Sequence, residues 1–261
     1  MHNLLVRVPA HCRASMSTRK TLLLLGTALL FATAAFGQSS GNFTYGTGGG
    51  TTACVMDSGG TITGGQTCEM SCSVDALGNS TCTDQTGTCI GSAIAGIKTS
   101  SGNGNVFVVR PSAVVGLLTD VTVSSKQGTT GAVSSSALAG ANFSVTVKPL
   151  SGQAKPTITP SYPITYDSRY IQISTNLFQA LAGTCLAITD GCFITFNQST
   201  VSAHSFDWIV SNLSAGNYGV TVNWQDTLGG SGISKSLTCV GPVNMTVQQN
   251  KIFNFNSVNS F

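Results

Sequence analysis

The sequence predicts an all-β protein, folded as an antiparallel β-sandwich. Three observations lead to this prediction: short runs in which apolar and polar residues alternate, clusters of Gly, Pro, Ser and Asn that separate those runs, and a charged fraction of only 8%. A period of two is the pattern of a half-buried strand. Helix-rich soluble proteins carry roughly a quarter charged residues, so this composition excludes them. A hydrophobic fraction of 41% argues against disorder.

The first 37 residues have the order of a secretory signal peptide. Arg19 and Lys20 stand before an uncharged, apolar run over residues 21–37, and that run ends in small residues. A basic start, an apolar centre and a small-residue end are the three parts of such a leader. An uncleaved membrane anchor is the alternative, but a span usually needs about twenty apolar residues and this run is shorter. We therefore expect a protein that is secreted or held at the cell surface.

Cleavage is expected between Gly37 and Gln38, and a cut after Ala34 is the second choice. Translation can start at Met1 or at Met16, because the segment before the apolar run is long for a leader. Removing residues 1–37 takes away four of the twelve Lys and Arg residues. Eight then remain against nine Asp and Glu, and the formal charge falls from +3 to −1. No basic cluster is left, so we expect no nucleic-acid partner and no membrane association after cleavage.

The cysteines predict a disulfide framework. The leader contains Cys12, so an even number remains in the mature chain, as is typical of secreted proteins. A metal site is the alternative, but the mature chain has no C-x-x-C pair and only one histidine, His204. We therefore expect no metal and no cofactor. The eight mature cysteines are Cys54, Cys68, Cys72, Cys82, Cys89, Cys185, Cys192 and Cys239.

Two of the pairings can be predicted in part. Cys185 and Cys192 flank a short turn at residues 189–191, and we expect them to be bonded across a hairpin. Cys239 is far from every other cysteine in the sequence, so we expect it to tie the C-terminal part to the Cys-rich segment. The other connectivities stay open.

The mature chain divides into two parts by composition. Residues 38–90 hold five of the eight mature cysteines, many glycines and few large apolar residues. Such a segment lacks a core of its own, so we expect a small cap or arm held by disulfides. Residues 91–261 are expected to form the sandwich domain.

Strand after strand follows within residues 91–261. In the clearest run, Phe143, Val145 and Val147 alternate with polar residues, so these three side chains should share one buried face. One helical turn is expected at residues 175–181, with Ser174 or Thr175 as its cap. The expected strands are 106–109, 121–124, 142–148, 170–173, 192–196, 206–210, 218–224, 243–247 and 252–255.

The spacing of Leu213, Gly216 and Tyr218 resembles the tyrosine corner of immunoglobulin-like and fibronectin-type sandwiches. There, a tyrosine at the start of a strand hydrogen-bonds back to the backbone a few residues upstream. The resemblance covers about a dozen residues and implies a fold class only, since such folds host unrelated functions. It implies that Tyr218 is a structural corner. Trp224 lies on the same face of the alternating run as Tyr218, Val220 and Val222, so we expect it in the core. The segments 165–169 and 203–206 are similar to secreted bacterial proteins without an assigned activity, and this implies no residue role.

Catalytic chemistry has little support in the sequence. His204 lies near Ser202 and Asp207, but no nucleophile elbow occurs between a strand and a helix. A glycosidase needs two converging carboxylates. The pair Asp207 and Asp226 is left open, although turn and cap roles suit these residues better. We therefore predict that the protein has no catalytic residues and is not an enzyme.

Three tyrosines are the candidate binding residues. Tyr162, Tyr166 and Tyr170 all have even numbers, so a regular extended chain would place them on one face. Aromatic side chains on one face can stack on sugar rings. The alternative is that they fill a sheet interface, as most aromatics do.

Three functions follow in order of preference. The first is a secreted, non-catalytic sandwich that acts in surface structure, adhesion or binding, with a polysaccharide or a surface protein as its partner. The second is a carbohydrate-binding module that uses the clustered tyrosines. The third is a hydrolase whose site the sequence does not reveal.

Overall fold

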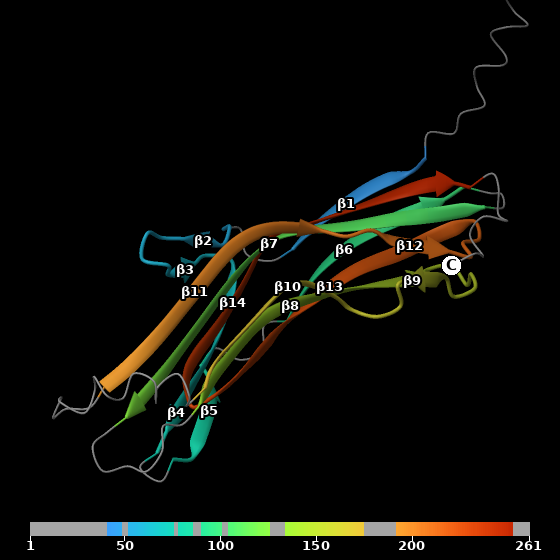
Figure 1. Ribbon diagram of the computed structural model, residues 1–261. Coiled ribbons are helices and arrows are strands. Elements are labelled where there is room, and N and C mark those ends of the chain that lie inside the picture. Colours follow the sequence, from blue (N-terminus) through green and yellow to red (C-terminus); the bar gives the residue numbers. More distant parts are fainter. Residues whose placement is uncertain are drawn as a thin grey trace, which may run out of the picture. The chain divides into compact units, whose positions relative to one another are not determined.

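The structure of the protein is a computed structural model that describes residues 41–48, 52–75, 78–85, 90–100, 104–125, 134–174 and 192–252. Every regular element in these ranges is a β-strand, and the paired strands are antiparallel (Figure 1). The all-β prediction is therefore confirmed. The helical turn expected at residues 175–181 lies outside the described residues.

The larger sheet has eight strands and is built around two long ones, β7 (Asn105–Ser125) and β14 (Ile233–Lys251), which pair with each other. Beyond β7 lie β11 and β12, with β9 at the edge next to β12. Beyond β14 lie β1 and β4, with β5 at the edge next to β4. The flanking strands are β1 (Phe43–Gly48), β4 (Gln66–Val74), β5 (Ser80–Asp84), β9 (Thr157–Thr159), β11 (Cys192–Ser205) and β12 (Trp208–Ser211).

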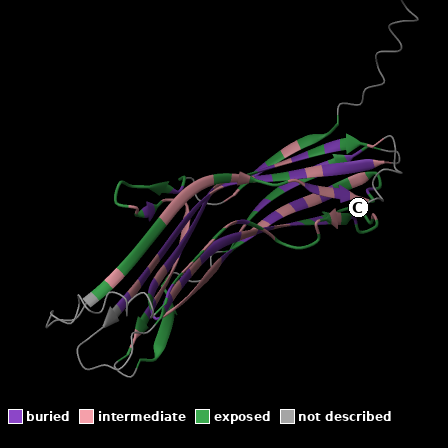
Figure 2. Ribbon diagram, in the orientation of Figure 1, coloured by how far each residue is buried: buried purple, intermediate pink, exposed green. Residues whose placement is uncertain are grey.

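The smaller sheet has four strands in the order β10 (Ile164–Ile173), β8 (Ser135–Pro149), β13 (Gly216–Ser231) and β6 (Ile90–Thr99). Its inner face packs on that of the larger sheet, and buried residues of both sheets form the main core. On β13, the even-numbered residues from Tyr218 to Trp224 are buried, and the alternation of buried and half-buried positions is visible in Figure 2. The predicted inner face of residues 142–148 is also confirmed, because Phe143, Val145 and Val147 are buried.

Tyr218 makes the contact of a tyrosine corner. Its hydroxyl donates to the carbonyl oxygen of Ser214 at 3.0 Å and accepts from the Ser214 N–H at 3.1 Å. The ring is fully buried, and its centroid lies 5.6 Å from that of Phe107 on β7, in an edge-to-face arrangement. One side chain thus anchors the turn before β13 and packs against the opposite sheet.

Replacing Tyr218 by Phe is expected to lower the free energy of unfolding by about 1 kcal/mol, because it removes one buried hydroxyl and leaves the ring. Urea unfolding of the Tyr218→Phe variant measures this loss. Tyr45→Phe is the control, since the Tyr45 side chain is exposed. Equal midpoints for Tyr218→Phe and the wild type would contradict the anchoring role.

The Cys-rich segment takes part in the sandwich. Its strands β1, β4 and β5 belong to the larger sheet, so the described part of residues 38–90 adds strands to the sandwich. Among the described strands of this segment, the hairpin of β2 (Val55–Met56) and β3 (Ile62–Thr63) alone stands apart, as a two-stranded sheet. From there Ile62 packs on the outer face of β7 and β14, in a second apolar cluster with Cys54, Leu118, Leu237 and Cys239.

Disulfides hold this segment to the sheet. Cys54 is bonded to Cys239, which confirms that Cys239 ties the C-terminal part to the Cys-rich segment. Cys72 is bonded to Cys82 across β4 and β5, and Cys68 is disulfide-bonded as well. The pairing of Cys185 with Cys192 lies outside the described residues.

Candidate functional site

The three candidate tyrosines do not share one face. Tyr166 is buried, whereas Tyr162 and Tyr170 expose 63% and 59% of their surface. Tyr162 precedes β10, which begins at Ile164, and a bulge in β10 separates Tyr166 from Tyr170: Thr165 pairs with Asn142 on β8, and the register resumes only at Asp167. One extra residue reverses the alternation of a strand, so the even-number rule fails beyond this point. The expectation of a single face is wrong for Tyr166.

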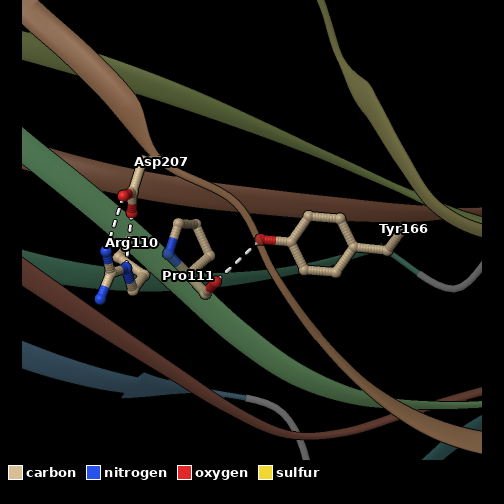
Figure 3. A network of polar contacts seen from close by, with 4 residues as sticks. All are labelled: Arg110, Pro111, Tyr166 and Asp207. Atoms are coloured by element: carbon tan, nitrogen blue, oxygen red, sulfur yellow. Dashed lines mark hydrogen bonds and ion pairs between the residues drawn. The ribbon is translucent and has the colours of Figure 1, made fainter.

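Tyr166 is an interior side chain that links the two sheets. Its ring stacks on Phe143 with centroids 4.0 Å apart, and its hydroxyl donates to the Pro111 carbonyl oxygen on β7 at 2.9 Å (Figure 3). Burial raises the pKa of the Tyr166 hydroxyl far above its ordinary value. The hydroxyl therefore stays protonated and serves as a hydrogen-bond donor.

The bulge also turns the side chain of Asp167 toward two polar residues of β11. Ser202 and His204 lie two residues apart on β11, so their side chains point to the same side of the strand. The Ser202 hydroxyl is 2.6 Å from His204 Nε2 and 3.3 Å from Asp167 Oδ2. Asp167 Oδ2 is 3.7 Å from the same Nε2. These three residues, which we call the seam cluster, join β10 of the smaller sheet to β11 of the larger one.

In the sequence, Asp207 is the carboxylate that lies near Ser202 and His204. The structure supplies Asp167 instead, 35 positions before Ser202. No local signal marks this contact, because it depends on the bulge and on two edge strands that meet across the sandwich.

The seam cluster has a nucleophile, a base and an acid, but not the geometry of a catalytic triad. In a triad, the serine is at Nε2 of the histidine and the carboxylate holds Nδ1, which fixes the tautomer and the ring orientation. Here Ser202 and Asp167 both approach Nε2 of His204. The carboxylate therefore competes with the serine for one nitrogen and does not orient the ring. The contacts of the seam cluster instead connect β10 to β11.

Asp207 has a different partner. Arg110 Nε and Nη2 each donate to one carboxylate oxygen of Asp207 at 2.6 Å, a bidentate pair between β7 and the segment that leads into β12 (Figure 3). The hydrogen bonds from Arg110 lower the pKa of Asp207. Asp226, the other carboxylate left open by the sequence, is buried on β13 of the smaller sheet.

We expect the contribution of Asp207 to stability to vanish in acid. Because its pKa is lower in the folded state than in the unfolded chain, the ionised form stabilises the fold above the ordinary aspartate pKa near 3.8. That stability is lost as the pH falls through the folded-state pKa. The difference in unfolding free energy between the wild type and Asp207→Asn should thus be constant near neutral pH and shrink steadily once the pH falls below 3.8, the ordinary aspartate pKa. Urea midpoints across this range measure it, and a difference that grows in acid would contradict the pairing.

Within the described ranges, no group of three or more His, Cys, Asp or Glu side chains is placed to hold a metal ion. The same ranges contain no helix of the length and apolarity that a membrane span requires. No family model matches the chain, and a search of curated proteins finds no match.

Proposed function

We propose that the protein is an extracytoplasmic, non-catalytic β-sandwich that acts in surface structure, adhesion or binding. The disulfides support the compartment, because such bonds persist in oxidising environments and are rare in the cytosol. The basic, apolar and small-residue order of the first 37 residues supports export. Sequencing of the exported protein should give an N-terminus at Gln38. Intact leader in a membrane fraction would contradict this part of the proposal.

One observation supports the non-catalytic role above all others: Nε2 of His204, the only histidine of the mature chain, is hydrogen-bonded to Ser202, and Asp167 Oδ2 lies 3.7 Å from the same nitrogen. General acid–base work near neutral pH falls most often to histidine, and it needs a ring that is oriented from its other nitrogen. The neighbouring polar groups are also engaged. The Tyr166 hydroxyl is bonded to the backbone, and Asp207 is bonded to Arg110. The first contact connects β10 to β7, and the second connects β7 to the segment that leads into β12.

The test is a screen of the purified mature chain, from Gln38 onward, on ester, peptide and glycoside substrates. A His204→Ala variant is assayed beside it, with Ser202→Ala as a second probe of the seam cluster. We expect no turnover by any of the three proteins and a lower unfolding midpoint for both variants. Turnover that disappears in both variants would overturn the proposal in favour of a hydrolase.

Carbohydrate binding is the second candidate, because Tyr162 and Tyr170 are both exposed. Exposed aromatic rings offer apolar faces on which sugar rings can stack. If this role holds, the wild type should be retained on insoluble cellulose or chitin, and a Tyr162→Ala, Tyr170→Ala double variant should not. Tyr45→Ala is the matched control, since Tyr45 is exposed on β1, away from β10. Equal retention of both variants would exclude these tyrosines as the binding residues.

A further inference from the structure

The most unusual surface of the sandwich is the free edge of β11. This strand pairs residue for residue with β7, from Ser125 to Ser112, without a register shift. Among the described residues no strand pairs with its other side. The hairpin of β2 and β3 pairs only within itself, and it meets β11 through the side chains of Met56 and Ser199. A row of backbone donors and acceptors over fourteen residues is thus open to another strand.

Folded proteins normally protect such an edge by keeping it short or by adding charges, prolines or bulges. Most of the other edges of this sandwich follow that rule. The edge strand β10 carries a bulge together with Asp167 and Arg169. The edge strands β9 and β5 have only three and five residues, and β5 ends in Asp84.

The edge strand β6 is protected in another way. The Ile90 carbonyl oxygen accepts from the side chain of Gln66, and the Lys98 carbonyl oxygen accepts from that of Asn42. Acceptors on this edge are therefore already used by the chain itself. Asn42 immediately precedes β1, the edge strand of the larger sheet, which is short, with six residues.

None of these devices occurs on β11. Residues 192–205 contain no Asp, Glu, Lys, Arg or Pro, and the strand has no bulge. It also carries the exposed rings of Phe193, at 73% exposure, and Phe196. In Figure 2 the strand is exposed along much of its length. A long, regular and uncharged edge with exposed aromatics is the kind that pairs with another chain.

We propose that two copies of the chain associate through β11. The two strands pair antiparallel across a two-fold axis perpendicular to the sheet, so that the larger sheet of one copy continues into that of the other. With this axis the inner faces of both copies stay on the same side. The seam cluster remains within each copy, because Ser202 and His204 contact Asp167 of their own chain.

A second copy fits this edge better than a foreign segment for two reasons. The first is charge: neither β11 carries a charged residue, so no register of self-pairing places like charges opposite each other. The second is order. Each β11 is already an extended strand held by β7, whereas a disordered partner would lose backbone entropy on pairing. Pairing also covers part of the exposed surface of Phe193 and Phe196.

The test compares molar mass in solution for the full mature chain and two matched double variants. Phe193→Lys with Ala203→Lys adds two charges to β11 at exposed positions on one face of the strand. Phe43→Lys with Tyr45→Lys adds the same charges at exposed positions on β1. We expect the wild type and the β1 variant to be dimers by sedimentation equilibrium. The β11 variant should have half that mass at the same concentration.

Hydrogen exchange gives an independent reading on the unaltered chain. Amides of residues 193–205 on the free edge should become more protected as the protein concentration rises, while those of β10 should not change. A monomeric wild type at every concentration, or a β11 variant that keeps the dimer mass, would overturn the proposal. Exchange in β11 that is as fast at the highest protein concentration as in a free edge strand would do the same, whether or not the Lys variants fold.

Discussion

Replacing both Cys54 and Cys239 by Ser is expected to lower the free energy of unfolding by about 5 kcal/mol. The bond joins residues 185 positions apart, so it restricts the unfolded chain over most of the described sequence. In the chain-entropy account, the stabilisation grows with the logarithm of the loop that the bond closes. Both cysteines are also buried in the cluster between the β2–β3 hairpin and the larger sheet. Urea unfolding of the oxidised double variant and the wild type measures the loss.

The bond between Cys72 and Cys82 provides an internal control. It spans only 10 positions, for which the same account gives about 3 kcal/mol. It also links two strands, β4 and β5, that already pair with each other. The Cys72→Ser, Cys82→Ser variant should therefore be clearly more stable than the Cys54→Ser, Cys239→Ser variant. Equal losses would show that loop length does not govern stability here.

The regular parts of the fold could be predicted because their pattern is local. Alternation over residues 142–148 and 218–224 identifies the inner faces of β8 and β13 without knowledge of any partner strand. Disulfide formation could be predicted from the number of cysteines. The partner of Cys239 could be narrowed to the Cys-rich segment. Cys185 and Cys192 were expected to bond to each other, and the remaining cysteines of the mature chain all lie in that segment.

The length of the two central strands could not be predicted. Residues 106–109 and 121–124 were expected as separate strands, yet β7 runs through both and includes Pro111 and Gly116. Gly116 makes no turn. It leaves room for the β2–β3 hairpin, because a Cβ there would lie 3.0 Å from a methyl carbon of Ile62. A glycine that permits close packing and a glycine that breaks a strand look the same in one sequence.

The candidate site was hidden for a related reason. The inserted residue of the bulge is Tyr166, so no glycine or proline marks the bulge in the sequence. The Tyr166 side chain is held in the core by stacking on Phe143 and by the hydrogen bond to Pro111. A bulge of this kind reverses every following side chain. It therefore changed both the tyrosine face and the position of Asp167. The contact of Asp167 with His204 then depends on tertiary structure alone.

Replacing Trp224 by Ala is expected to lower the free energy of unfolding by about 3–5 kcal/mol. The Trp224 side chain is 2% exposed and stacks on Phe143, with ring centroids 6.0 Å apart. Its Nε1–H donates to Gln66 Oε1 on β4 at 3.0 Å, so the variant leaves both a cavity and a polar group without its donor. The absence of a side chain at Gly91 on β6 also leaves room for the Trp224 indole. A Cβ at Gly91, its partner on β6, would lie 2.0 Å from the indole.

Two further variants separate the contributions of the indole. Trp224→Phe keeps an aromatic ring but removes the N–H, so its loss should be smaller than that of Trp224→Ala. Gly91→Ala keeps Trp224 and forces the ring out of its place, because the added methyl would overlap the indole and the backbone of β6 is fixed by its pairing with β13. We therefore expect Gly91→Ala to destabilise the fold as well, by about 1–3 kcal/mol. Unfolding midpoints in urea rank the three variants. A Trp224→Ala protein as stable as the wild type would mean that the indole does not fill the space between β13, β6 and β4, and the inner face of β13 would then have to be assigned again.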